Sequence, residues 1–147
     1  MRLLRLAAAW HDLGFTVSAG EHEAVGVSLA RAHLPGFGIT GDDLERVAGL
    51  ILATRLPQSP RTLAERILAD ADLDVLGRED FLARSALLRA ERAALGGAVS
   101  DAAWYEEQLA FLRGHRYCTP GARALRDEGK RRNLRRLHAL WTSCTGR

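Results

Sequence analysis

The chain has 147 residues, of which 47% are hydrophobic, so it is long enough to bury a sizeable apolar core. Its 4 prolines, 6% aromatic residues and many Ala, Leu and Arg residues favour helices, and β-branched residues are too scarce for a sheet. The formal net charge is +3, and no stretch approaches the roughly 18 apolar residues that a membrane span requires.

Helix start and stop signals divide the chain into seven segments. We expect helices over residues 2–13, 22–34, 40–56, 60–76, 79–95, 100–113 and 120–142. Thr40 and Asp43 have the spacing of a capping box, and the dipeptides Ser59-Pro60 and Thr119-Pro120 mark two further helix starts. Seven helices with short connections predict one compact all-α domain over residues 1–147, without an internal boundary.

Two polar residues end the apolar run of the first segment, in "AAAWHDLGF". Adjacent residues in a helix point about 100° apart, so His11 and Asp12 cannot face a common point from a helix interior. At a frayed helix end they can. This position therefore predicts a binding role for the pair, with a surface or capping pair as the alternative.

A second group of acids lies late in the fourth segment, in "LADADLDVLG". Asp70, Asp72 and Asp74 alternate with apolar residues, and buried carboxylates cost several kcal/mol unless a cation compensates them. A divalent metal would satisfy His11, Asp12 and one of these acids, and this nitrogen and oxygen set suits Mn, Fe, Mg, Zn or Ni. An exposed helix face is the alternative.

These motifs occur in an order that resembles a known family. The segments are "LAAAWHDLGF", "EHEAVGVSLARAHL", "GDDLERVAGLILATR", "LADADLDVLG" and, more loosely, "YEEQLAFLRGHRYCTP" with "EGKRRNLRRL". Together they resemble the HD-domain superfamily of metal-dependent phosphohydrolases, most closely its branch of small bacterial predicted phosphohydrolases. The resemblance spans nearly the whole chain and implies an HD-domain-like helical fold.

The resemblance also implies a ligand set for one divalent metal. The family uses an upstream His, an adjacent His and Asp, and a distant Asp; His11 and Asp12 match the pair, and Asp72 matches the distant Asp, with Asp70 as the alternative. Asp12 and Glu23 are the expected catalytic carboxylates. Glu21, His22 and Glu23 are also candidates for orienting the ligating His, for binding substrate, or for a plain helix-capping role.

Two departures from the family pattern change the expectation. None of the ten residues before His11 is a His, so either an N-terminal helix is missing and Met1 is an internal start, or the chain has lost that ligand. In addition, "ATRLP" stands where proteins of this family with two metals often carry further histidines, which argues against a binuclear site. Arg55 in this stretch is a candidate for binding substrate phosphate, with an exposed helix end as the alternative.

The basic residues gather in the last part of the chain. Residues 113–147 hold 10 Arg and Lys residues against 2 acids. We expect five of them to lie on one side of the last helix, where Lys130 and Arg131 in particular could bind a substrate phosphate: Lys130, Arg131, Arg132, Arg135 and Arg136. A solvated helix face and a nucleic-acid contact are the alternatives.

These expectations lead to one principal function and two alternatives. The principal one is a metal-dependent phosphohydrolase acting on a phosphomonoester or nucleotide. The alternatives are a degenerate, non-catalytic HD domain that binds a nucleotide or partner protein, and a helical module that binds nucleic acid through the basic tail. Cys118 and Cys144 match no metal or redox spacing, which predicts a reduced, cytoplasmic protein without a membrane partner, with an oligomer as an open option.

Overall fold

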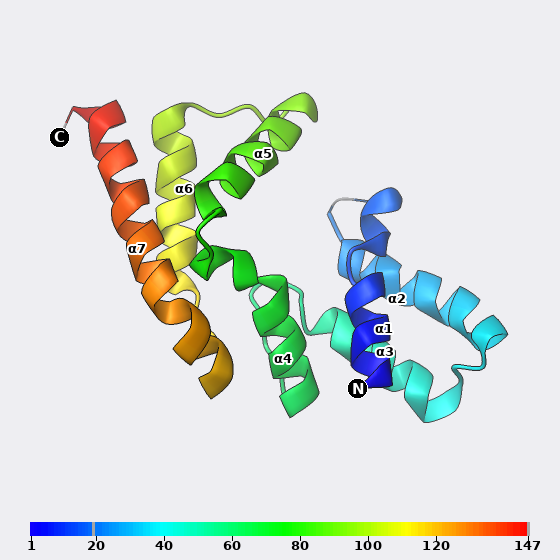
Figure 1. Cartoon of the computed structure of the whole chain (residues 1–147). Helices are drawn as coiled ribbons and strands as arrows, with labels where there is room; N and C mark the ends of the chain where they lie inside the picture. The colour runs from blue at the N-terminus through cyan, green and yellow to red at the C-terminus, as the bar shows by residue number, and fades with distance from the viewer. Residues whose placement is uncertain (19, 147) are drawn as a thin grey trace. The chain divides into compact units, whose positions relative to one another are not determined.

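The computed structural model describes residues 1–18 and 20–146, and that part of the chain contains helices and no strands (Figure 1). The α-helices are α1 (Arg2–Trp10), α2 (His22–His33), α3 (Gly41–Leu52), α4 (Leu63–Asp72), α5 (Phe81–Ala94), α6 (Asp101–Gly114) and α7 (Pro120–Thr145). Three short 3₁₀ helices are η1 (Leu13–Thr16), η2 (Leu34–Phe37) and η3 (Asp74–Gly77). The predicted all-α class and the seven helical segments are confirmed.

The helices form two compact units, residues 1–72 and residues 73–147. Each unit has a buried apolar cluster of its own. Seven helices with short connections predicted one domain without an internal boundary. Since two packing units can belong to one domain, a single domain over residues 1–147 stays a prediction. No helix among the described residues is long and apolar enough to cross a membrane.

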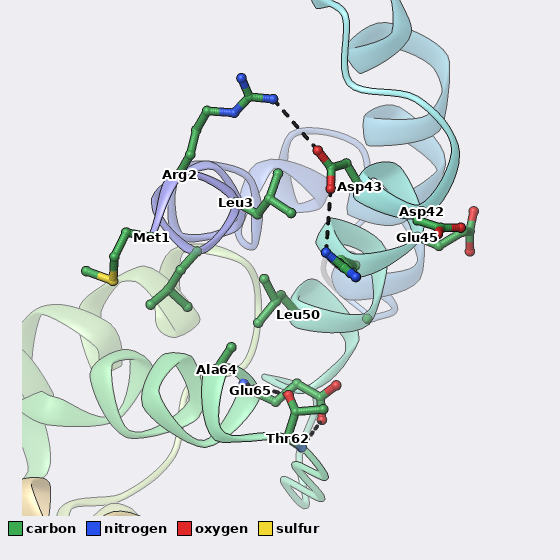
Figure 2. A pocket seen from close by; sticks show the side chains of 13 residues that line it. Met1, Arg2, Leu3, Asp42, Asp43, Glu45, Leu50, Thr62, Ala64 and Glu65 are labelled. Atoms are coloured by element: carbon green, nitrogen blue, oxygen red, sulfur yellow. Dashed lines mark hydrogen bonds and ion pairs between the residues drawn. The ribbon is translucent and has the colours of Figure 1, made fainter.

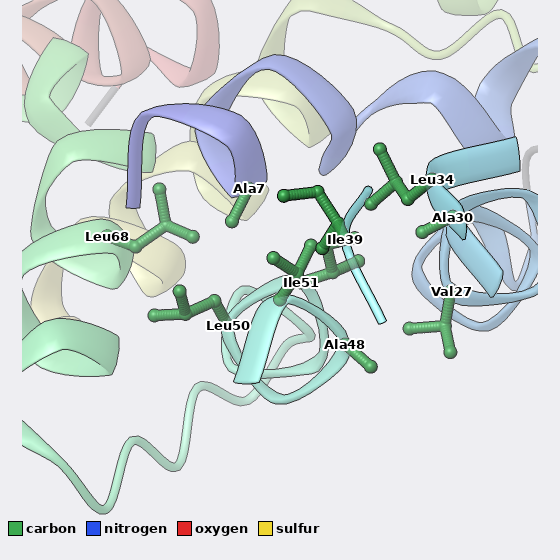
Figure 3. Packing of buried hydrophobic residues seen from close by; sticks show 10 residues of the cluster. Ala7, Val27, Ala30, Leu34, Ile39, Ala48, Leu50, Ile51 and Leu68 are labelled. Atoms are coloured by element: carbon green, nitrogen blue, oxygen red, sulfur yellow. The ribbon is translucent and has the colours of Figure 1, made fainter. Parts of the chain in front are cut away.

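The core of the first unit lies between α1, α2, α3 and α4 (Figure 3). Val47 and Ile51, one helical turn apart on α3, are fully buried, and they belong to the same cluster as Ala7 of α1 and Ala30 of α2. The small side chain of Ala7 allows α1 to approach α3 closely. This packing fixes the C-terminal end of α1, where His11 and Asp12 follow.

The core of the second unit attaches α7 to the turn η3 and to α6, which runs beside α7 (Figure 1). Asn133 is fully buried, and its side-chain amide donates to the carbonyl oxygens of Leu76 (3.0 Å) and Arg78 (2.8 Å). The helix and the turn touch at two glycines, since a Cβ at Gly129 would lie 1.9 Å from the carbonyl oxygen of Gly77. Only Gly therefore fits at residue 129.

Several predicted helix ends are wrong. Thr40 is the N-cap of α3 but its side chain makes no capping hydrogen bond. The capping box instead opens α4: the Thr62 hydroxyl accepts from the Glu65 N–H (3.2 Å), and the Glu65 carboxylate accepts from the Thr62 N–H (3.1 Å). This helix therefore begins at Leu63 rather than at Pro60, and it ends at Asp72, before η3. The predicted start of α7 is confirmed, because the Thr119 hydroxyl accepts from the Ala122 N–H.

Candidate functional site

His11 and Asp12 lie where α1 ends, as their position in the sequence predicted. The helix stops at Trp10, and His11 is its C-cap. The chain then turns into η1, which brings the carboxylate of Asp12 back toward the imidazole of His11. The His11 Nε2 and Asp12 Oδ2 atoms are 3.2 Å apart, so the two neighbours do face a common point.

Asp72 reaches the same imidazole from the end of α4. Its Oδ1 atom lies 3.3 Å from His11 Nε2, and its Oδ2 atom accepts a hydrogen bond from Gln58 Nε2 (3.3 Å). The Gln58 amide also donates to the Ala69 carbonyl (3.1 Å), so Gln58 holds both the carboxylate of Asp72 and the last turn of α4. Nothing in the spacing of the sequence pointed to Gln58, which lies in the irregular connection before α4.

The imidazole of His11 has a fixed orientation. Its Nδ1 atom is 2.9 Å from the Ala8 carbonyl oxygen, and a carbonyl only accepts, so Nδ1 carries a proton and donates it. Nε2 then faces the carboxylates of Asp12 and Asp72. The hydrogen bond with Asp72, together with the bond to Ala8 and the charge of Asp12, raises the pKa of His11 to about 9, against the opposing effect of burial. This position therefore favours a positive charge.

A second histidine joins the cluster from the start of α2. His22 Nε2 lies 3.3 Å from Glu23 Oε1 and 3.9 Å from Asp12 Oδ1. Its ring stacks on Phe15, with the centroids 3.7 Å apart and the planes at 16°. Glu23 is buried, so its carboxylate is held against His22. We call these five residues the histidine–carboxylate cluster: His11, Asp12, His22, Glu23 and Asp72.

One glycine allows this cluster to form. A Cβ at Gly14 would lie 1.7 Å from the carbonyl oxygen of His22, so any side chain at residue 14 would push η1 away from α2. The close contact keeps Asp12 and Phe15 beside His22. From its sequence, Gly14 was predicted only to end a helix, because its contact with His22 depends on how η1 packs against α2.

Three other candidates in the first unit lie outside the cluster. Asp70 is buried in α4, two residues before Asp72 and therefore about 200° around the helix from it. Glu21 is exposed at the N-cap of α2, where its side chain makes no capping hydrogen bond. Arg55 is exposed just beyond α3, and none of the cluster's ion pairs involves it.

The phosphate-binding candidates Lys130 and Arg131 lie in the second unit. Lys130 is buried and donates to the carbonyl oxygen of His115 (2.5 Å), whereas Arg131 is exposed and pairs with Glu128 (3.0 Å). Arg135 also reaches Glu128, but Arg132 reaches Glu79, on a different side of α7. The expectation that the five basic residues share one side of this helix is therefore wrong, because α7 buries Lys130 against its own unit.

Two further findings bear on ligands. Across residues 1–18 and 20–146, no group of three or more His, Cys, Asp or Glu side chains is already arranged to hold a metal ion. A cavity of about 940 Å³ lies elsewhere in the first unit, over Leu3, Leu50 and Ala64, with Asp43 and Glu65 at its edge (Figure 2). None of the residues that line it belongs to the histidine–carboxylate cluster.

Comparison with known proteins found no matching protein family, no matching curated protein and no matching solved structure.

Proposed function

We propose that the chain is a metal-dependent phosphohydrolase of the HD type, acting on a phosphomonoester or nucleotide with one divalent cation. The observation that carries the proposal is the position of His11 Nε2, which lies 3.2 Å from a carboxylate oxygen of Asp12 and 3.3 Å from one of Asp72. The ordered sequence motifs that resemble the HD superfamily support the same assignment.

The residue types at this point suit a cation. Ligand atoms that share a cation at about 2.0–2.2 Å lie roughly 3 Å apart, which is close to the distances from His11 Nε2 to Asp12 Oδ2 (3.2 Å) and to Asp72 Oδ1 (3.3 Å). The bond from His11 Nδ1 to the Ala8 carbonyl leaves Nε2 as the ligating atom, and Gln58 orients Asp72 in the way that outer hydrogen bonds orient metal ligands. His11, Asp12 and Asp72 would hold the metal.

A bound divalent cation lowers the pKa of a water ligand and neutralises charge on phosphoryl oxygens. The chain's own groups would do the rest. The Asp12 side chain is 60% exposed, so substrate can reach it, whereas His22 lies 3.3 Å from the carboxylate of the buried Glu23 beside it. In this proposal the Glu23–His22 pair accepts a proton at the site, and the exposed Arg55 contacts a phosphate oxygen.

The non-catalytic alternative also has a specific observation in its favour. In the part of the chain that the structure describes, no three metal-binding side chains are already arranged for an ion. A domain that kept the cluster as an electrostatic network, with protonated His11 between two carboxylates, could bind a nucleotide or a partner protein without hydrolysis.

Metal content decides between these two functions. We would purify the protein without chelator, load it with Mn²⁺, Fe²⁺, Zn²⁺, Ni²⁺ or Mg²⁺, and measure bound metal by elemental analysis. The matched variants are Asp72→Asn, which removes a proposed ligand, and Asp42→Asn, which removes an exposed acid of α3. We expect about one metal per chain in the protein and in Asp42→Asn, and none in Asp72→Asn. Metal binding that Asp72→Asn leaves unchanged would contradict the site.

Activity is the second readout. A panel of phosphomonoesters and nucleotides, assayed with each metal, should show turnover that chelator abolishes and that Asp12→Asn abolishes. Absence of both metal and turnover would favour the non-catalytic alternative.

A further inference from the structure

A second pocket, in the other unit, is unusually rich in cations. It has a volume of about 380 Å³ and lies between the end of α6, the connection that follows it and α7. Its lining includes two leucines, Leu112 and Leu134, and one carboxylate, Asp127. The lining also includes five basic side chains: Arg113, Arg116, Arg123, Lys130 and Arg131.

Lys130 is the unusual member of this set. It is only 9% exposed, its ammonium group donates to the His115 carbonyl oxygen (2.5 Å), and it lies 5.6 Å from the centre of the Tyr117 ring. No described carboxylate lies within ion-pair distance of it. Burying an ammonium group is costly, and burial lowers the pKa of Lys130 below the usual lysine value, against the opposing effect of the Asp127 charge.

The other cations do not have enough acids to neutralise them. Arg131 pairs with Glu128 (3.0 Å), and Arg123 donates to the Tyr117 carbonyl (3.3 Å). Arg113 and Arg116 are exposed and form no ion pair with any residue that the structure describes. The pocket lining therefore sets five cations against one carboxylate, Asp127, and four of the five cations form no ion pair with a described residue.

We propose that this pocket binds a small ligand with two or more phosphate groups. Guanidinium groups match phosphate oxygens with paired hydrogen bonds, and a lysine ammonium adds a point charge. The volume is in the range of small-molecule sites. A bound polyphosphate would supply the direct ion-pair partner that Lys130 lacks among the described residues.

The aromatic lining favours a small ligand over single-stranded nucleic acid. Proteins that bind single strands present aromatic faces on which bases stack. Tyr117 has the largest aromatic ring in the lining, but it is 1% exposed, and its hydroxyl donates to the Leu73 carbonyl (3.2 Å). Its ring is therefore closed to a base.

The test uses inorganic tripolyphosphate as the probe, titrated by calorimetry at low salt with chelator present. Arg116→Ala and Arg113→Ala remove exposed cations of the pocket, so neither threatens folding. Arg135→Ala is the matched control, because it removes one exposed charge from the same helix outside the pocket lining. We expect one site per chain, affinity about tenfold weaker in each pocket variant, and less than a twofold change in the control.

A local readout comes from the lysine itself. Lys130 is the chain's single lysine, so ¹³C-lysine labelling yields one side-chain signal, which should shift on addition of tripolyphosphate. Asp72→Asn should bind the probe as the unsubstituted protein does, which separates this site from the proposed metal centre. Four outcomes would each overturn the proposal. The first two are no binding of tripolyphosphate at low salt, and a loss of affinity in Arg135→Ala equal to that in the pocket variants. The other two are an unshifted lysine signal, and tighter binding of longer oligonucleotides than of tripolyphosphate.

Discussion

His11 Nε2 lies 3.3 Å from Asp72 Oδ1, although the two residues come from opposite ends of the first unit's sequence. The contact joins the end of α1 to the end of α4. Acids at a helix C-terminus are disfavoured by the helix dipole, so Asp72 gains from a positive partner at this point. Two residues further on, Asp74 at the start of η3 forms two hydrogen bonds with Arg126, at 2.5 and 3.1 Å.

The first prediction concerns pH and His11 in metal-free protein. A raised pKa means that the folded protein binds the proton more tightly than the unfolded chain does. The stabilisation of the folded state by protonated His11 is therefore complete below about pH 6.5 and is lost as the pH rises through about 9. We expect the free energy of unfolding to fall by about 1–2 kcal/mol across this window, after allowance for solvent screening.

Urea denaturation with chelator at pH 6 and pH 9.5 measures this loss. Asp72→Asn should remove most of the pH dependence, because Asp72 is the largest cause of the raised pKa. His138→Gln, at an exposed histidine of α7, is the control and should keep it. The same pH dependence in Asp72→Asn as in the unsubstituted protein would contradict the contact.

The second prediction concerns Gly14. A Cβ there would lie 1.7 Å from the His22 carbonyl oxygen, so Gly14→Ala must displace η1 from α2. We expect a loss of about 2–3 kcal/mol of stability, typical of overpacking, and a loss of metal binding. Gly36→Ala is the control, because a Cβ at Gly36 would meet no atom within 4 Å. Thermal unfolding and metal analysis measure both effects, and equal stability of the two variants would refute the close packing.

The third prediction concerns Asn133 in the second unit. Asn133→Ala would remove two hydrogen bonds and leave the Leu76 and Arg78 carbonyl oxygens without this donor. We expect a loss of about 2–3 kcal/mol, since unpaired buried polar groups add to the loss of the bonds themselves. Hydrogen exchange followed by mass spectrometry should show faster exchange in α7 and η3. Unchanged exchange there would show that the amide does not anchor the helix.

The fourth prediction concerns Tyr117. Burial raises the pKa of its phenol to about 12, so the folded protein resists ionisation and the unfolded chain does not. Stability is therefore complete below about pH 10 and falls as the pH rises toward 12. Tyr117→Phe should cost about 1 kcal/mol at pH 7, through the lost bond to Leu73, and should show a shallower fall between pH 9 and 11. Denaturation curves at these pH values measure the difference, and parallel pH profiles would contradict the buried phenol.

Sequence alone predicted the elements whose causes are local. Ala- and Leu-rich runs form helices by intrinsic propensity, and Pro and Gly mark their ends, so all seven helical segments were found. The neighbours His11 and Asp12 could also be placed at a helix end. The capping box was placed at Thr40 rather than at Thr62, because two stretches fit the same short pattern and only packing selects between them.

Tertiary structure decided what depends on distant parts of the chain. His22 joins the cluster because α2 begins beside the end of α1, and Gln58 contacts Asp72 from the connection before α4; no spacing rule encodes either approach. Lys130 reads as one more exposed cation in a basic run, yet α7 buries it because its neighbours Asn133 and Gly129 must lie against η3. Helical propensity comes from a few contiguous residues, whereas the face that a helix buries is chosen by the surface it packs against.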